Sequence, residues 1–315
     1  MGIDRPGIGD DEVLLRVHAA GVGRDVWHVM AGLPYPMRLA GYGLRAPNNP
    51  VIGSDVAGVV EVAGKNVSRF RPGDEVFGIG KGSFAEYTGA REDKLAPRPE
   101  NLTFEQAAAV AISGLTALQG LRDHGKVGPG QRVLIVGASG GVGTYAVQIA
   151  KAYGAHVTGV CATAKVGMVR SIGADRVVDH TREDFADGEG RYDLILDIGG
   201  NSSLSRLRRA LTPRGTLIIA GGEGKGRWLG GTDRQLRALA LSSFVGQKLG
   251  TFVSSENHGD LIILKDLIES GRVTPVIDRT YPLEEAPEAI RYLEEGRAKG
   301  KVVVSVRGEP EGSLL

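Results

Sequence analysis

VLIVGASGGVGTYAVQIA, residues Val133 to Ala150, carries the strongest structural signal in the chain. An apolar run of strand type comes first, then glycines at positions 137, 140, 141 and 143, and then apolar residues at helical spacing. Glycine permits a tight turn and lets the backbone approach a phosphate closely, and the free N–H groups at a helix start attract anionic oxygen. The stretch predicts a strand, loop and helix that hold the pyrophosphate of a dinucleotide. The alternative is a glycine-rich turn in an empty α/β domain, since G-A-S-G-G-V-G is not the plain G-x-G-x-x-G.

The surrounding chain has two styles of sequence. Up to about residue 100, short runs of β type are broken by turn residues, which predicts a compact, mostly β domain. From Thr103, which we expect to cap a helix reaching Leu121, helices and strands alternate. Six β-branched runs at intervals suited to crossover helices predict a parallel sheet covered on both faces; they are Arg132–Gly137, His156–Cys161, Arg176–His180, Asp193–Ile198, Thr216–Gly222 and Leu249–Ser254. Two further helices, over 259–271 and 282–296, and a closing strand at 299–306 follow.

Composition excludes several classes of function. A chain of 315 residues, 42% of them hydrophobic, can bury a large core in two domains. The 38 basic and 37 acidic residues nearly cancel, so we expect neither nucleic acid nor a membrane as partner. The single cysteine, Cys161, forms no intrachain disulfide or cysteine-built zinc cluster and fits a reducing interior. Because the start has no signal-peptide core and no apolar run approaches the ~20 residues of a membrane span, we expect a cytoplasmic protein.

The choice of dinucleotide depends on the end of the second strand of the sheet. An acidic residue there would accept hydrogen bonds from a free ribose 2′-OH, but Cys161 and Ala162 occupy the position. Thr163 and Lys165 instead offer a hydroxyl and a charge for a 2′-phosphate, which favours NADPH over NADH. The alternative for Lys165 is an ordinary solvated lysine. His180, at the end of the third strand, either stacks near the adenine or merely ends its strand.

These segments together resemble the medium-chain dehydrogenase/reductase superfamily, in its zinc-free quinone oxidoreductase branch. The resemblance covers nearly all of the chain and rests on AAGVGRDVWHVMAG, PVIGSDVAGVVEVAGKNVSRFRPGDEVFG, AISGLTALQGL, VLIVGASGGVGTYAVQIAKAYGA, SIGADRVVDHTRED and KGKVVVSV. It implies an α/β protein with a GroES-like, mostly β substrate domain, residues 1–105 and 256–315, and a six-stranded parallel Rossmann NADP-binding domain, residues 106–255. It also implies a cofactor cleft between the domains and a homodimer joined through the Rossmann sheet edges.

Departures from the family pattern decide the expected chemistry. Zinc-dependent relatives place a cysteine ligand where this chain has Gly23 and a His-Glu pair where it has Ser54 and Asp55, and their four-cysteine zinc lobe has no counterpart. We therefore expect no zinc, because a catalytic zinc needs three such ligands. Without a Lewis acid, hydride donation to an already activated acceptor remains feasible. Family members also usually begin with an additional strand pair, so we expect either a trimmed substrate domain or a misplaced start.

The resemblance also suggests catalytic residues. Arg24 and Asp25 match a loop that faces the nicotinamide, and His28 matches a proton-relay position. Arg24 would bind an enolate oxygen or the nicotinamide ribose, and His28 would donate a proton. The alternative is a salt-bridged, solvated loop. The insert at 31–50, with Tyr35 and Tyr42, is expected to cover the substrate cleft.

Other positions complete the expected cofactor site. Thr116 matches a residue beside the nicotinamide, although its hydroxyl can also bond its own helix backbone. Gly221 and Gly222 end the fifth strand, residues 252–254 end the sixth, and Asp197 is expected to be structural. The full cofactor set is Thr116, Gly137, Ser139, Gly140, Gly141, Val142, Gly143, Thr163, Lys165, His180, Gly222, Phe252, Val253 and Ser254.

Three functions remain open at this point. The leading one is an NADPH-dependent, metal-independent reductase of a small quinone or α,β-unsaturated carbonyl. The second is a zinc-free alcohol or aldehyde dehydrogenase on the same scaffold. The third is a non-enzymatic NADPH-binding protein.

Overall fold

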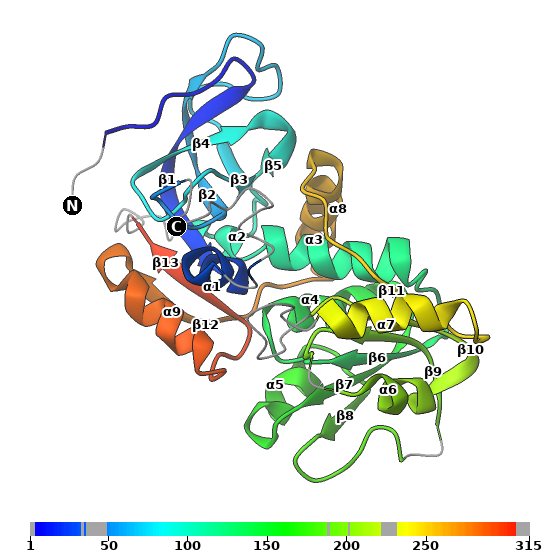
Figure 1. Cartoon of the computed structure of the whole chain (residues 1–315). Helices are drawn as coiled ribbons and strands as arrows, with labels where there is room; N and C mark the ends of the chain where they lie inside the picture. The colour runs from blue at the N-terminus through cyan, green and yellow to red at the C-terminus, as the bar shows by residue number, and fades with distance from the viewer. Residues whose placement is uncertain are drawn as a thin grey trace.

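The computed structural model describes residues 4–32, 35, 49–187, 190–200, 202–221 and 232–306. Figure 1 shows two domains side by side, one built mainly of strands and the other of a central sheet with helices around it. The mostly β domain combines the first and the last described strands of the chain, and the α/β domain is formed by the residues between them.

The mostly β domain contains a seven-stranded sheet in the order β12-β13-β1-β2-β3-β5, with β4 paired to β1. The strands are β1 (Glu12–Val22), β2 (Asp55–Ala63), β3 (Glu75–Ile79), β4 (Tyr87–Arg91), β5 (Leu95–Pro97), β12 (Ile277–Pro282) and β13 (Lys301–Ser305). Antiparallel pairing of β1 with β13, with Ala20 opposite Val304, joins the two parts of the chain. The GroES-like domain expected from the sequence is confirmed.

The α/β domain is a six-stranded sheet in the order β11-β10-β9-β6-β7-β8, with every neighbouring pair parallel. The strands are β6 (Arg132–Val136), β7 (His156–Cys161), β8 (Arg176–Asp179), β9 (Tyr192–Asp197), β10 (Leu211–Ile219) and β11 (Lys248–Thr251). This is the doubly wound Rossmann order, in which ligands bind where the strand order reverses, here between β6 and β9. The predicted parallel sheet is confirmed.

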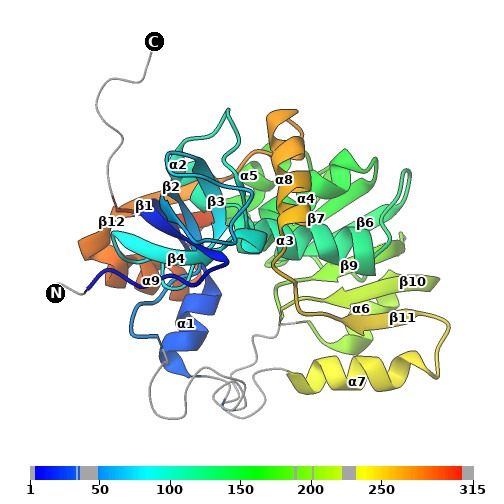
Figure 2. The ribbon, with the colours of Figure 1, turned by 90° about the horizontal axis from the view of Figure 1, so that it is seen from above.

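Successive side chains of β6 point to opposite faces of the sheet, and each face is covered by helices. Val133 and Ile135 join one core with α3 (Ala111–Gln119), α4 (Gly141–Ala152) and α5 (Val166–Ser171). Leu134 and Val136 point to the opposite face and join a second core with α6 (Leu204–Ala210) and α7 (Thr232–Ser242). Figure 2 shows α7 on the opposite side of the sheet from α3 and α4.

The structure differs from the sequence expectation in several places. The helix predicted from Thr103 to Leu121 is divided into α2 (Phe104–Ala108), α3 and a π-helical turn at Gly120–His124, although Thr103 does cap it through a capping box with Gln106. The described part of the connection from β8 to β9 contains no helix. Strand β12 was not predicted, because its polar sequence, IDRTYP, lacks the usual apolar pattern.

The two domains meet along α8 (His258–Glu269), which packs on α3, and along the segment that leads into β13. The remaining helices, α1 (Arg24–Ala31) and α9 (Ala286–Glu294), pack on each other in the mostly β domain. Sheet membership agrees with the predicted division of the chain, whose boundaries at 105/106 and 255/256 stay a prediction. Within the described residues, no helix has both the length and the apolar character needed to cross a bilayer.

Candidate cofactor and substrate site

The loop between β6 and α4 lies where the strand order reverses. Glycine is suited to each of its positions for a different physical reason. Gly137 has φ of +89°, a backbone conformation that residues other than glycine adopt only with strain. A Cβ on Gly143 would collide with the carbonyl oxygen of Gly137, so this position brings α4 tightly against the loop. A Cβ on Gly140 would meet only that same oxygen, at 3.6 Å, which is ordinary contact. The space above Gly140 is therefore open.

The open space at Gly140 lies at the amino end of α4. Gly140 is the N-cap of α4 and no side chain caps this helix end. The first N–H groups of a helix lack partners within the helix and favour negative charge. An open cradle lined by such donors fits the pyrophosphate of a nicotinamide dinucleotide. Ser139, Gly141 and Val142 belong to the same loop and first turn, as expected from the sequence.

A buried ion pair supports this loop from the other domain. Lys301 Nζ lies 2.8 Å from Asp55 Oδ2, and the two side chains are 3% and 2% exposed. The other carboxylate oxygen of Asp55 accepts a hydrogen bond from the N–H of Ile112, at 2.7 Å. A Cβ on Gly141 would come within 3.0 Å of Lys301 Cδ, so the lysine stem lies directly against the first turn of α4. The preceding residue, Gly300, donates its N–H to the carbonyl of Ser139 at 2.9 Å.

The residues expected at the ribose lie together beyond β7 and β8. Thr163 Oγ1 is exposed and donates to Asp179 Oδ2 at 2.5 Å. Lys165 donates to the carbonyls of Gly296 and Ala298, at 2.9 and 2.7 Å, and burial lowers the pKa of its ammonium. It is thus a half-buried contact between the domains as well as a candidate phosphate ligand. His180 is exposed next to this group, and its N–H donates to the carbonyl of Cys161, the residue that ends β7.

The residues expected at the nicotinamide are only partly brought together. Thr116 Oγ1 donates to the carbonyl of Ile112 at 2.8 Å and lies 3.2 Å from Ser254 Oγ, so both roles considered for it are compatible with its position. Val253 is 94% exposed just beyond the end of β11. The ring of Phe252 points inward, stacks on His124 with centroids 4.5 Å apart, and lies beside Gly120. Its side chain therefore packs against the π-helical turn.

The expected catalytic residues lie on α1, immediately after β1, so the segment that was expected to be a loop is a helix. Gly23 is the N-cap of this helix, and the buried side chain of Val26 packs the helix against α9. Arg24 is exposed, and His28 is half-buried, with its ring 5.1 Å from that of Trp27. Asp25 also belongs to α1. Gly222 and Tyr42 lie outside the described residues, and Gly221 passes so close to Ile198 that a Cβ there would collide with its carbonyl.

The positions at which the sequence comparison with metal-dependent relatives places zinc ligands are Gly23, Ser54 and Asp55. Gly23 has no side chain, and the carboxylate of Asp55 is already paired with Lys301. Among the residues that the structure describes, no group of three or more His, Cys, Asp or Glu side chains is placed to hold a metal ion. Burial raises the pKa of the Cys161 thiol to about 11, so the thiol is protonated near neutral pH.

Asp197, at the end of β9, is structural as expected. It is fully buried and forms an ion pair with Arg234 of α7, which also donates to the carbonyls of Ser202 and Gly221. Desolvation by burial raises the pKa of Asp197, opposed by the positive charge of Arg234. The pair anchors α7 at the carboxyl ends of β9 and β10.

Replacing Arg234 with methionine should lower stability in a pH-dependent way. The variant leaves the buried carboxyl of Asp197 without its cation, so the pKa of Asp197 in the native state rises further above its value in the unfolded state. The native state then binds more protons than the unfolded state in the window between the two pKa values, and the free energy of unfolding falls as pH rises through it. We expect a loss of about 3–5 kcal/mol near neutral pH and a smaller loss at about pH 5. Urea unfolding at several pH values measures this, and an equal loss at every pH would contradict it.

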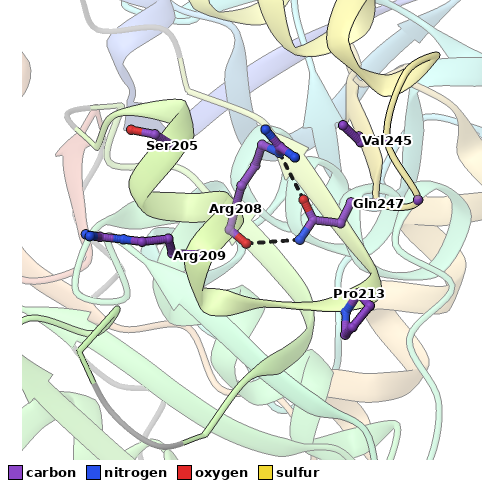
Figure 3. Close-up of a pocket in the computed structure, with 7 residues that line it drawn as sticks. Ser205, Arg208, Arg209, Pro213, Val245 and Gln247 are labelled. Atoms are coloured by element: carbon purple, nitrogen blue, oxygen red, sulfur yellow. Dashed lines mark hydrogen bonds between the residues drawn. The ribbon is translucent and has the colours of Figure 1, made fainter.

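A second hollow lies away from the glycine loop. It has a volume of about 430 Å³ and is lined by residues of α6, by Pro213 near the start of β10 and by residues 245–247, which precede β11. Figure 3 shows Arg208 bonded through its Nε to Gln247, whose amide donates back to the carbonyl of Arg208. Because it lies at the amino ends of its strands, it is not the cofactor site.

Sequence reasoning missed two residues that the fold places at the site. Lys301 stands in the quoted segment KGKVVVSV, but only the structure brings it under Gly141. Asp179 ends the strand RVVD, and its carboxylate reaches Thr163 of the neighbouring connection. The available signal in both cases was a charged residue at the end of an apolar strand.

Comparisons with known proteins agree with this arrangement. Residues 9–100 match the family model of the alcohol dehydrogenase GroES-like domain, and residues 172–304 match that of a zinc-binding dehydrogenase. The mouse protein named NAD(P)H oxidoreductase RTN4IP1, mitochondrial, is 34% identical over 94% of this chain and 82% of its own length. The tomato protein named 2-methylene-furan-3-one reductase is 33% identical over 95% of this chain and 73% of its own length.

A solved structure supports the same relationship. The quinone oxidoreductase from Coxiella burnetii superposes with a TM-score of 0.84 at 26% identity, over 97% of this chain and 93% of its own. Both domains and nearly the whole length are therefore shared. The chain belongs to the medium-chain dehydrogenase/reductase superfamily of oxidoreductases, in its quinone oxidoreductase-like branch.

Proposed function

We propose that this protein is an NADPH-dependent, metal-independent reductase of quinones or α,β-unsaturated carbonyl compounds. The observation that carries the proposal is the open, uncapped helix start at Gly140, placed where the Rossmann strand order reverses. Relatives named for a quinone and for an enone substrate support the acceptor class.

Preference for NADPH rests on the charge beside the ribose position. Neither Cys161 nor the following residue carries a carboxylate, and Lys165 stands within the same connection as Thr163. The ammonium of Lys165 has three N–H groups, of which two are used by the carbonyls of Gly296 and Ala298. One N–H remains for a 2′-phosphate oxygen.

An activated acceptor is proposed because the donor set does not provide a Lewis acid. Oxidation of a simple alcohol is aided by a metal that stabilises the alkoxide, an effect worth several kcal/mol of barrier. With Gly23 and the Asp55–Lys301 pair at the relevant positions, stabilisation must come from hydrogen-bond donors. Quinones and enones suit such a site because their carbonyl already withdraws charge from the carbon that is attacked.

A nicotinamide held at this site would supply a hydride, which is two electrons and one proton. With an enone as acceptor, the β-carbon would gain the hydride in a new C–H bond, the C=C π electrons would move toward the carbonyl oxygen, and the α-carbon would then take up a proton. We propose that Arg24 donates hydrogen bonds to the carbonyl oxygen as its charge develops and that His28 provides the proton. Both extend from α1, and His28 follows Val26 by two residues, which places it on the opposite face from the buried one.

Turnover with a panel of acceptors tests the proposed function. Purified protein is supplied with NADPH and either 9,10-phenanthrenequinone, 1-octen-3-one or a matched saturated aldehyde, octanal. Oxidation of NADPH with the quinone or the enone, and little with octanal, is the expected result. Reduction of octanal alone would favour the alcohol or aldehyde dehydrogenase, and binding of NADPH without any turnover would favour the non-enzymatic alternative.

His28→Phe tests the proton donor. The variant keeps an aromatic ring beside Trp27 but removes the titratable group. We expect kcat for the enone to fall about 100-fold while the Kd for NADPH stays within twofold, because general acid catalysis contributes to the transition state only. Trp27→Phe is the matched control and should retain kcat. A His28→Phe enzyme with unchanged kcat would remove His28 from the mechanism.

We also propose a cytoplasmic homodimer. Strand β11 forms one edge of the Rossmann sheet, and apolar side chains near it are exposed, namely Leu236, Leu239 and Phe244. An edge strand with such neighbours is suited to pairing with a second copy. Sedimentation equilibrium tests this, since a mass of one chain would contradict it. Cell fractionation tests the compartment, for which the mouse relative is named as mitochondrial.

A further inference from the structure

We infer that Asp179 is a specificity residue that limits the preference for NADPH, so that the wild-type protein accepts both NADPH and NADH. The inference rests on the proposed function, since it concerns the same cofactor site. It predicts that removal of this one carboxylate makes the protein markedly more selective for NADPH.

Asp179 occupies the place of the acidic residue that β7 lacks. In Rossmann domains a carboxylate at the end of the second strand accepts the ribose 2′-OH. Here Cys161 ends that strand, and in the parallel ladder Asp179 of β8 is its register partner. The carboxylate therefore comes from the carboxyl end of the neighbouring strand. Its Oδ2 accepts a hydrogen bond from Thr163 Oγ1 at 2.5 Å.

Hydrogen bonding around Asp179 commits the nearby hydroxyl protons. Thr163 donates its single hydroxyl proton to Oδ2, and Thr181 donates both its hydroxyl, at 2.8 Å, and its N–H, at 3.0 Å, to Oδ1. With both protons directed at the carboxylate, the two hydroxyl oxygens, which lie 3.0 Å apart, present lone pairs to a ligand. Lone pairs accept a hydrogen bond from the 2′-OH of NADH, whereas they repel the oxygens of a 2′-phosphate.

The charges around Asp179 do not cancel this effect. Arg182 approaches Oδ2 only to 3.6 Å and its side chain is 75% exposed, so solvent screens the pair. Lys165 spends two of its donors on the carbonyls of Gly296 and Ala298. The bonds from Thr163 and Thr181 lower the pKa of Asp179, so the carboxylate is charged at neutral pH. A 2′-phosphate thus meets Lys165 with a single available donor, the solvent-screened Arg182, and the carboxylate of Asp179.

Asp179→Asn tests the inference with little change of shape. The amide can donate to Thr163, which frees the hydroxyl proton for a phosphate and removes the negative charge. Kd values for NADPH and NADH are measured by titration calorimetry. We expect NADPH to bind about tenfold more tightly than in the wild type, as removal of a nearby like charge implies, while NADH changes by less than about threefold.

Two further variants separate this effect from others. Glu183→Gln removes a carboxylate from the same connection, one that pairs with Arg176, and should leave the NADPH-to-NADH ratio unchanged. Thr163→Val removes the hydroxyl but keeps Asp179, and should weaken NADH binding. It also provides a test if Asp179→Asn fails to fold.

The outcomes distinguish this inference from the proposed function. A ratio that does not move in Asp179→Asn, or that moves equally in Glu183→Gln, would overturn the role of Asp179 while both cofactors still bind. An unchanged NADH affinity in Thr163→Val would also count against it. A wild-type protein that binds neither cofactor would overturn the proposed function together with this inference.

Discussion

Gly140→Ala should leave the fold intact and weaken NADPH binding by about 100-fold, which corresponds to about 2.7 kcal/mol. The backbone at Gly140 is extended, with φ of −87°, and a methyl group there would make only one ordinary contact, at 3.6 Å. The methyl group would instead fill the open cradle and hold the pyrophosphate away from the amino end of α4. Titration calorimetry of NADPH and urea unfolding together measure the two effects.

Two other glycines provide controls for this substitution. Gly143→Ala should lose stability as well as binding, because its Cβ would collide with the carbonyl of Gly137 and force α4 away from β6. Gly167 lies in α5 with nothing within 4 Å of the position of a Cβ, so Gly167→Ala should change neither property adversely. A Gly140→Ala protein that binds NADPH as tightly as the wild type would mean that the cofactor does not lie on this loop.

Lys301→Met should lower the free energy of unfolding by about 3–5 kcal/mol. Asp55 would lose the cation at 2.8 Å and keep the hydrogen bond from the N–H of Ile112 on its other oxygen. The effect should extend to the cofactor, because the lysine stem supports Gly141 at the first turn of α4. Urea unfolding measures the stability, and the Kd for NADPH measures the effect on the loop.

A double-mutant cycle separates the ion pair from simple loss of packing. Asp55→Asn alone leaves the buried ammonium unpaired and should also destabilise strongly. The combination with Lys301→Met removes both charges and should cost less than the sum of the two single losses. Additive losses would show that the two residues do not act as a pair. The surface pair of Arg91 and Asp93, both about half exposed, is the control and should contribute about 1 kcal/mol or less.

Much of the fold was predictable because its signals are local. Each of the six β-branched runs indicates a strand by its own sequence, and the glycines at 137–143 indicate a turn. All six runs form strands of one parallel sheet. The capping box that begins α2 lies within four residues, from Thr103 to Gln106. Strand β12 was missed because IDRTYP becomes a strand through pairing with β13, a contact that the local pattern does not encode.

The site was predictable only where one segment forms it. The glycine loop satisfies that condition, whereas the residues that surround it come from distant segments. Lys301 reaches Asp55 across 246 positions of sequence, and Asp179 reaches Thr163 from the next strand. The sequence could not indicate that Phe252 turns inward, because the π-helical turn that accommodates its ring forms through packing.

Transfer of deuterium by metal-depleted protein tests the central claim most directly. Protein dialysed against a chelator is given 1-octen-3-one and NADPH that carries deuterium on the transferred side of the nicotinamide, and the product is analysed by mass spectrometry and NMR. The account predicts undiminished turnover, no gain on adding zinc, and one deuterium at the β-carbon of the saturated ketone. Activity that disappears on chelation and returns with zinc, or a product without deuterium at that carbon, would contradict it.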